Sequence, residues 1–193
     1  MKRLFLSLLA LANVAPICFA QTDNPSAAER FAQPSSDLVS RENGYWKRTP
    51  MPVPDDIVLE VSGILPLPNK RLLVTTRRGE MWFIDGAYDQ DPHPKYTLFA
   101  SGLHTPLGII VAPPGGYYVA QRQELTRIAD TDGDGRADLF ETVCKLPISG
   151  AYHEYAFGPV MAPNGNLRMT LNVAFGGPTQ APAPWRGWMI EIT

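Results

Sequence analysis

The chain has 193 residues, of which 45% are hydrophobic, 17 are Lys or Arg and 19 are Asp or Glu. This length suits one ordinary domain behind a leader, and the hydrophobic fraction is that of a globular protein. The near balance of charge leaves no basic face, so we expect no nucleic-acid partner.

The first 20 residues predict a cleavable secretory signal peptide. Basic residues at the start precede an apolar run over residues 4–12, and Ala20 ends a small-residue cleavage site. The apolar run is shorter than the roughly 20 residues that span a bilayer. The alternative is a lipid on Cys18, which Ile17 disfavours because lipoprotein signals carry a small residue at its position. We therefore expect a protein exported to the periplasm or the extracellular space, without a membrane span.

Residues 21–56 predict a polar, proline-rich leader. Ser, Pro, Asn and Gln are frequent in this segment, and apolar periodicity is absent. Residues 26–32 could form a turn or two of helix. Two interpretations stay open for the leader, namely a tether and a strand that docks on the domain that follows.

From residue 57 to residue 193 the sequence predicts an all-β domain built from repeats. Strand-like runs occupy residues 72–76, 117–120 and 167–171, and each follows a turn signal that contains Pro, Gly or Asn. The three runs recur at shifts of 45 and then 50 residues, together with a preceding Gly-to-Pro frame that starts at Gly63, Gly108 and Gly158.

A period of about 40–50 residues built from short strands is typical of the blades of a β-propeller. Only three such repeats are present, whereas propellers close with roughly 4–8 blades. We therefore interpret residues 57–193 as three N-terminal blades of an incomplete propeller, which would expose an apolar face. The alternative fold is a β-sandwich.

One cysteine, Cys144, remains after the predicted cleavage, so no intrachain disulfide can form. Its apolar neighbours predict a buried, unreactive thiol. An exported protein without a disulfide is stabilised by core packing, by a metal or by assembly.

The strongest local motif covers residues 130–141 and carries the excess negative charge of the chain. Its spacing fits the calcium loop of twelve positions, with carboxylates at alternating positions and a glycine at the bend. The flanking residues predict strands rather than the helices of an EF-hand, so we expect a structural calcium clamp. The alternative is an acidic surface turn. The predicted ligands are Asp130, Asp132, Asp134, the backbone carbonyl of Arg136, Asp138 and Glu141.

A second candidate is His153, which lies just before the first strand of the third repeat. In a propeller this strand lines the central channel, so the loop before it opens at the channel mouth. A histidine there could act as a general base. The alternative is a histidine that fixes a turn by hydrogen bonding. His93 and His104 lie in loops rich in Pro and Gly and predict ordinary surface residues.

Three runs of the sequence resemble the glucose/sorbosone dehydrogenase-like family of exported six-bladed propellers. They are Pro106–Ile109, Asp130–Asp138 and His153–Leu167. The resemblance implies a soluble quinoprotein that oxidises a sugar or an alcohol with pyrroloquinoline quinone. It also implies that His153 is the catalytic base and that a longer parent carries a cytochrome or haem-binding domain.

The sequence departs from that family in two ways. Tyr152 stands where the enzymes carry an acidic partner beside the histidine, and the later blades that hold most quinone contacts are absent. Two functions therefore stay open. The chain is part of an oxidoreductase, too short to be a complete enzyme, or it is a calcium-stabilised module without catalysis that binds a protein or a glycan.

Overall fold

The computed structural model describes residues 36–46, 49–173 and 183–193, which fall into two compact units. In the first unit, residues 1–48, helix α2 covers Ser36–Asn43. The sequence analysis did not predict this helix. The predicted signal peptide and the possible helical turn at residues 26–32 lie outside the described residues. No helix in the described part of the chain is long and apolar enough to cross a bilayer.

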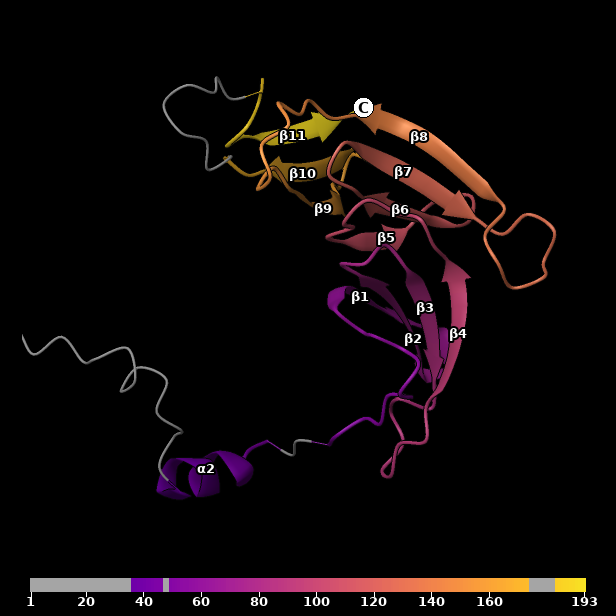
Figure 1. The fold of residues 1–193 in the computed structure, drawn as a ribbon, viewed down its shortest axis with the longest axis vertical. Coiled ribbons are helices and arrows are strands. Elements are labelled where there is room, and N and C mark those ends of the chain that lie inside the picture. Colours follow the sequence, from indigo (N-terminus) through magenta and orange to yellow (C-terminus); the bar gives the residue numbers. More distant parts are fainter. Residues whose placement is uncertain (1–35, 47–48, 174–182) are drawn as a thin grey trace, which may run out of the picture. The chain divides into compact units, whose positions relative to one another are not determined.

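The second unit, residues 49–193, is all-β and contains three antiparallel sheets (Figure 1). Sheet 1 consists of β1 (Val61–Leu67), β2 (Arg71–Thr76), β3 (Met81–Asp85) and β4 (Lys95–Ala100), with the short 3-10 helix η1 (Pro68–Lys70) between β1 and β2. Sheet 2 consists of β5 (Ile109–Val111), β6 (Tyr117–Ala120), β7 (Glu124–Ala129) and β8 (Leu139–Lys145). Sheet 3 consists of β9 (Ala156–Met161), β10 (Leu167–Leu171) and β11 (Met189–Ile192).

The three runs predicted as strands are confirmed as β2, β6 and β10. They form because β-branched and other apolar residues follow turns that only Gly or Asn accommodates easily. Asn69, Gly116 and Gly165 adopt φ values of 60°, 89° and 86° just before these strands.

The predicted repeat is present in the pairing of the strands. In every sheet, strands that follow each other in the chain are also neighbours in space. Equivalent residues of the first hairpins pair in the same register: Pro66 with Leu72, Val111 with Tyr117, and Met161 with Leu167. The second hairpins follow the same rule: Thr75 with Met81, Ala120 with Leu125, and Thr170 with Met189.

Glycines at one repeated position bring the first strands of the sheets together. A Cβ atom added to Gly63 would lie 3.3 Å from the Cα of Gly108, and one added to Gly108 would lie 2.0 Å from the carbonyl oxygen of Gly158. The backbones of β1, the start of β5 and β9 therefore approach each other at positions where a side chain does not fit.

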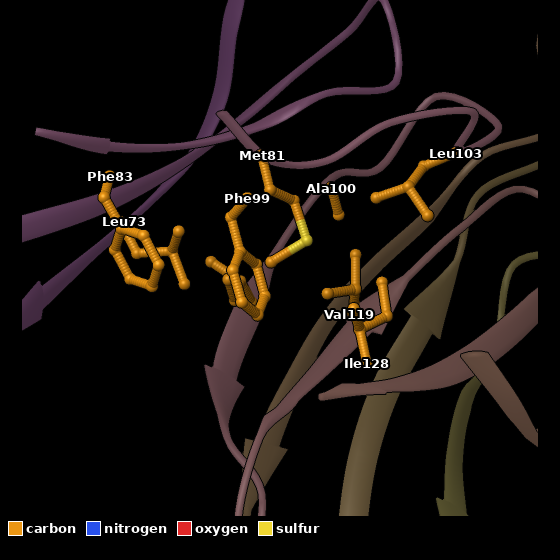
Figure 2. Close-up of a cluster of buried hydrophobic side chains, with 9 residues drawn as sticks. Leu73, Met81, Phe83, Phe99, Ala100, Leu103, Val119 and Ile128 are labelled. Atoms are coloured by element: carbon orange, nitrogen blue, oxygen red, sulfur yellow. The ribbon is translucent and has the colours of Figure 1, made fainter. Parts of the chain in front are cut away.

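Two apolar cores lie between the sheets. The core between sheets 1 and 2 contains the rings of Phe83 and Phe99 (Figure 2), whose centroids are 4.9 Å apart. Tyr117 packs edge-on against both rings. The core between sheets 2 and 3 includes Leu125 and Met169. Each fully buried side chain of this size contributes roughly 1.5–3 kcal/mol, so stacking stabilises sheets that could not fold alone.

The outer faces of the stack expose apolar side chains, as expected for an open arrangement. Ile64 of sheet 1 is 60% exposed, whereas the equivalent Ile109 of sheet 2 is 7% exposed in the first core. Val160 of sheet 3 is 59% exposed, whereas the equivalent Ile110 packs against the second core.

Part of the predicted leader contacts the sheets. The Tyr96 hydroxyl of β4 donates a hydrogen bond of 3.0 Å to the carbonyl of Pro52. This contact favours docking over a free tether for the residues around Pro52. The thiol of Cys144 is half-buried rather than buried. The reason is that β8 is the outer strand of sheet 2.

Candidate functional site

Antiparallel pairing sorts the loops of the sheets into two groups at opposite ends. One group, which we call the His153 end, contains the loops that connect the second strand of each sheet to the third and the loops that lead into each first strand. The Arg122 N–H bonds the His104 carbonyl at 3.2 Å, and the Asn172 N–H bonds the Tyr155 carbonyl at 3.2 Å, so these loops touch each other.

The predicted calcium loop belongs to the other end. It connects β7 to β8, beside the β5–β6 turn, where Arg127 donates to the Gly115 carbonyl at 2.9 Å. Strand β8 separates this loop from the segment that leads to His153, and its seven residues span roughly 20 Å. A cation in the loop therefore cannot act directly on a substrate at His153.

The structure gathers three of the predicted calcium ligands. Carboxylate oxygens of Asp130, Asp132 and Asp134 all lie within 4.8 Å of one another. Two oxygens that each lie about 2.4 Å from one calcium ion are at most about 4.8 Å apart, so this spacing fits a shared cation. Gly133 and Gly135 make the bend possible, since they adopt φ values of 82° and 91°.

Two other predicted ligands, Asp138 and Glu141, do not belong to this cluster. Asp138 accepts hydrogen bonds from the Thr131 N–H at 2.8 Å and from the Thr131 hydroxyl at 2.5 Å. Glu141 lies within strand β8, opposite Arg127, whose guanidinium is 3.4 Å away. The loop is flanked by strands β7 and β8, as predicted, and Glu141 lies inside β8 rather than in the loop. The three gathered aspartates and loop carbonyls, such as that of Arg136, are therefore the protein oxygens that could bind a cation.

Hydrogen bonds favour the ionised form of two carboxylates of this loop, those of Asp130 and Asp138. The N–H groups of Gly133 and Gly135 donate to Asp130 at 2.7 and 2.9 Å and lower the pKa of its carboxyl. The side chain and backbone of Thr131 lower the pKa of Asp138. At neutral pH the loop therefore offers hard, negatively charged oxygens, which is the donor chemistry that calcium prefers.

Side chains from neighbouring elements hold the segment that carries His153 by hydrogen bonds to its backbone. Asn172 donates to the His153 carbonyl at 2.7 Å and accepts from the Tyr155 N–H at 2.5 Å. Arg122 donates to the carbonyls of Glu154 and Ala151 at 2.9 and 2.7 Å. The His153 imidazole is exposed and lies edge-on to the ring of Tyr152, with centroids 4.8 Å apart. The backbone is thus fixed while the ring faces solvent.

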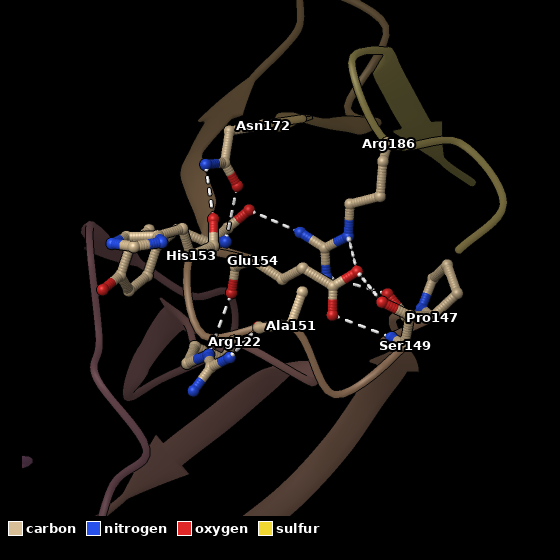
Figure 3. Close-up of polar contacts among 9 residues, drawn as sticks. Arg122, Pro147, Ser149, Ala151, His153, Glu154, Asn172 and Arg186 are labelled. Atoms are coloured by element: carbon tan, nitrogen blue, oxygen red, sulfur yellow. Dashed lines mark hydrogen bonds and ion pairs between the residues drawn. The ribbon is translucent and has the colours of Figure 1, made fainter. Parts of the chain in front are cut away.

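A buried ion pair lies behind this segment, and the sequence analysis did not identify it. The carboxylate of Glu154 and the Nε of Arg186 are 3.8 Å apart, and both side chains are fully buried (Figure 3). Glu154 also accepts from the N–H and the hydroxyl of Ser149. Arg186 donates to the carbonyls of Tyr155 and Pro147 at 2.7 and 2.8 Å. The pair therefore ties the loop between β10 and β11 to the segment that carries His153.

The charges of this pair depend on each other. Burial raises the pKa of Glu154, but the Ser149 hydrogen bonds and the Arg186 charge outweigh burial and lower it overall. Burial lowers the pKa of Arg186, and the Glu154 charge partly restores it. Figure 3 shows the imidazole of His153 pointing away from the Glu154 carboxylate, so this acid does not act as a proton partner of the histidine.

The remaining histidines are exposed, as predicted. His104 lies at the His153 end, and its Nδ1 is 2.5 Å from the Oε1 of Gln123. His93 lies in the loop between β3 and β4, 3.3 Å from Asp91.

Three arginines at the His153 end have partners within the protein, whereas Arg78 of the β2–β3 loop is exposed. Arg77 pairs with Glu60 at 2.8 Å, and Arg122 and Arg186 donate to backbone carbonyls. Pyrroloquinoline quinone carries three carboxylates and needs donors that are free to receive them. One exposed arginine does not match three carboxylates, so the described residues do not by themselves fit the quinone that the family resemblance implies.

Comparison with known proteins gives little further information. No protein-family model matches the chain, and no curated protein matches its sequence. One similar solved structure is a Thermus thermophilus protein that is provisionally described as an oxidoreductase (glucose dehydrogenase). It is 17% identical, with a TM-score of 0.48, and the match covers 61% of this chain and 39% of that one.

Proposed function

We propose that the second unit forms three blades of a β-propeller and that calcium in the β7–β8 loop stabilises it. The propeller is supported by the common register of the three sheets and by the close approach of Gly63, Gly108 and Gly158. In a propeller, antiparallel sheets of this kind stack on each other, with their first strands closest together. The calcium role is supported by one observation above all, namely the convergence of Asp130, Asp132 and Asp134.

Calcium should act by holding the long β7–β8 connection. The loop also touches sheet 1, because the Ala137 N–H donates to the Phe99 carbonyl of β4 at 2.8 Å. A cation that binds the three aspartates and reduces their repulsion would therefore stabilise both the hairpin and the contact between sheets 1 and 2. Waters would complete the shell of six to eight oxygens that calcium requires.

The test is thermal unfolding with calcium and with chelator. A ligand that binds only the folded state at about 100 times its Kd adds roughly 2.7 kcal/mol of stability, so calcium should raise the Tm by several degrees. Asp132→Asn should abolish most of this rise. Asp91→Asn is the matched control, because Asp91 is an exposed loop aspartate outside the cluster, with a side chain 93% exposed. Equal melting of the unmodified chain in both buffers would disprove the calcium role.

We also propose a second function for the His153 end: His153 removes the hydroxyl proton of a sugar or alcohol while a hydride passes from the carbon to an electron acceptor, a quinone or other cofactor of a longer protein. The observation in its favour is that the backbone around His153 is anchored by Asn172 and Arg122 while the imidazole stays exposed. A general base needs such a fixed position within about 3 Å of the proton it accepts. Since the described arginines do not by themselves fit a tricarboxylate quinone, we assign only proton removal to this chain.

The test of this function needs a longer protein that contains these blades. His153→Ala should lower kcat and leave the Tm unchanged, because a base acts in the transition state. His104→Ala, an exposed histidine at the same end, should leave kcat unchanged. The 193-residue chain alone should not reduce a dye with glucose. Unchanged turnover of the His153 variant would leave a non-catalytic module that binds a protein or glycan as the better proposal.

Export is proposed from the sequence alone. Cleavage after Ala20 should leave Gln21 as the first residue of the mature protein. N-terminal sequencing of the exported fraction tests this, and a lipid on Cys18 or an intact Met1 would contradict it.

A further inference from the structure

The outer face of sheet 1, which points away from sheet 2, is covered over only part of its area. Val74 of β2 and Ile84 of β3 are 2% and 1% exposed. They lie on the outer face because they alternate along their strands with Leu73 and Phe83, which belong to the first core. Ile64 of β1 lies opposite Val74 on the same face and is 60% exposed. The cover therefore lies over β2 and β3 and leaves β1 free.

The internal repeat shows what these positions require. Val119 and Ile128 of sheet 2 occupy the register positions of Val74 and Ile84, and both are fully buried. Sheet 1 covers them, since they belong to the core between the two sheets. Sheet 1 is itself the first of the three described sheets. Its outer face therefore has the character of a stacking face, and a segment outside the sheets must bury Val74 and Ile84.

Residues 49–60, which we call the strap, are placed to provide this cover. They precede β1 within the second unit. Towards one end, the Tyr96 hydroxyl of β4 donates to the Pro52 carbonyl at 3.0 Å. At the other end, the N–H and the guanidinium of Arg77, which follows β2, bond the carbonyl and the carboxylate of Glu60, each at 2.8 Å. The strap thus passes from β4 to the end of β2 and crosses β3.

The apolar side chains of the strap alternate between shielded and exposed. Ile57 and Leu59 are half-buried, whereas Val58 between them is 48% exposed. Tyr96, which holds one end of the strap, lies on the outer face because it pairs with Ile84. The strap therefore packs one apolar side on the outer face and turns the other to solvent.

The strap is attached less firmly than the sheets are to each other. The side chains of Arg77 and Glu60 are 58% and 41% exposed, and an exposed ion pair contributes little stability. Within the described residues, no ladder of backbone hydrogen bonds joins the strap to a strand of sheet 1. A segment held in this way opens at a lower free energy than the sheets beneath it.

We propose that the strap is a removable cover over an association face of this protein. While the strap is closed, it keeps Val74 and Ile84 from contact with other molecules. When it opens, the outer face of sheet 1 presents the kind of apolar surface by which sheet 2 stacks on sheet 1. The partner that fits it is therefore a sheet of a second copy of the chain. The inference rests on the packing of the strap and not on the calcium loop or His153.

The first measurement is the opening of the strap. In the full chain, Cys18→Ser, Cys144→Ser and Val74→Cys place the single thiol under the strap. Adding Leu59→Asp puts a charge on the shielded side of the strap and should raise the rate at which a disulfide reagent modifies this thiol by roughly tenfold or more. Val58→Asp is the matched control on the exposed side and should change the rate by no more than about twofold.

Two outcomes of this measurement would overturn the proposal. Equal rates in the two variants would mean that the strap does not cover β2. A faster rate in Leu59→Asp that is matched by an equal loss of global stability in urea would mean that the strap does not open independently of the sheets.

The second measurement is association, followed by sedimentation velocity with Val74 unchanged. If the open fraction rises tenfold, Leu59→Asp should lower the concentration at which half of the chain is associated by roughly tenfold, whereas Val58→Asp should behave like the unmodified chain. Adding Ile64→Asp to Leu59→Asp should reverse the association, because Ile64 is exposed on the same face outside the strap. Association that Leu59→Asp does not strengthen, or that Ile64→Asp does not reverse, would overturn the proposal.

Discussion

Gly108 gives the most direct test of the way the sheets stack. Its φ is 151°, which L-residues rarely adopt, and a Cβ atom there would lie 2.0 Å from the carbonyl oxygen of Gly158. In Gly108→Ala the first strands of sheets 2 and 3 must move apart by about 1.4 Å to reach ordinary van der Waals contact, or the new methyl group stays in a strained contact with the Gly158 carbonyl. Overpacking costs roughly 1–3 kcal/mol, and the backbone conformation adds roughly 1–3 kcal/mol.

Gly102→Ala is the matched control for this variant. Gly102 has a φ of 84°, but a Cβ atom added there meets nothing within 4 Å. The control therefore carries the cost of the backbone conformation, roughly 1–2 kcal/mol, without the contact between sheets.

Thermal unfolding followed by far-UV circular dichroism should separate the two variants. A loss of 1 kcal/mol lowers the Tm of a unit of this size by roughly 3–4 °C, so Gly108→Ala should melt several degrees below Gly102→Ala. Urea unfolding followed by tryptophan fluorescence should give the same order. If the two variants melt within about 2 °C of each other, the first strands do not approach as closely as we describe.

Two further predictions concern charged side chains of sheet 3 and its loops. Hydrogen bonds from Asn166, Arg168 and Asn164 lower the pKa of Glu191 to about 2. The ionised Glu191 carboxylate therefore stabilises the fold above its unfolded pKa, and this stabilisation is lost as pH falls through the folded pKa. The difference in urea midpoint between the unmodified chain and Glu191→Gln should therefore shrink as pH falls from about 4.5 towards 2. A constant difference over that range would contradict this assignment. Arg186→Met leaves the Glu154 carboxylate buried without its partner and should lower the free energy of unfolding in urea by roughly 3–5 kcal/mol. Adding Glu154→Leu to this variant should recover part of that free energy. Strictly additive losses would mean that the two side chains do not interact.

The sequence alone was sufficient to predict the second strand of each sheet, although it did not indicate helix α2. The residues of β2, β6 and β10 could be identified because short runs of strand-forming residues and the turn-forming Pro, Gly and Asn before them act over a few neighbours. The repeat and its shifts were equally visible, since equivalent strands carry similar residues. The strands on either side of the calcium loop followed from the same local signals, which excluded an EF-hand.

Contacts between distant residues required the tertiary structure. Glu154 and Arg186 are 32 positions apart, and nothing in their local sequence shows that both are buried and face each other. Five acidic residues were predicted to share one cation, but the register of β8 with β7 places Glu141 against Arg127 and leaves three aspartates together. Likewise, the direction of β8 places the predicted calcium loop and His153 at opposite ends. Periodicity specifies which residues form strands, whereas the pairing and stacking of those strands decide which side chains meet.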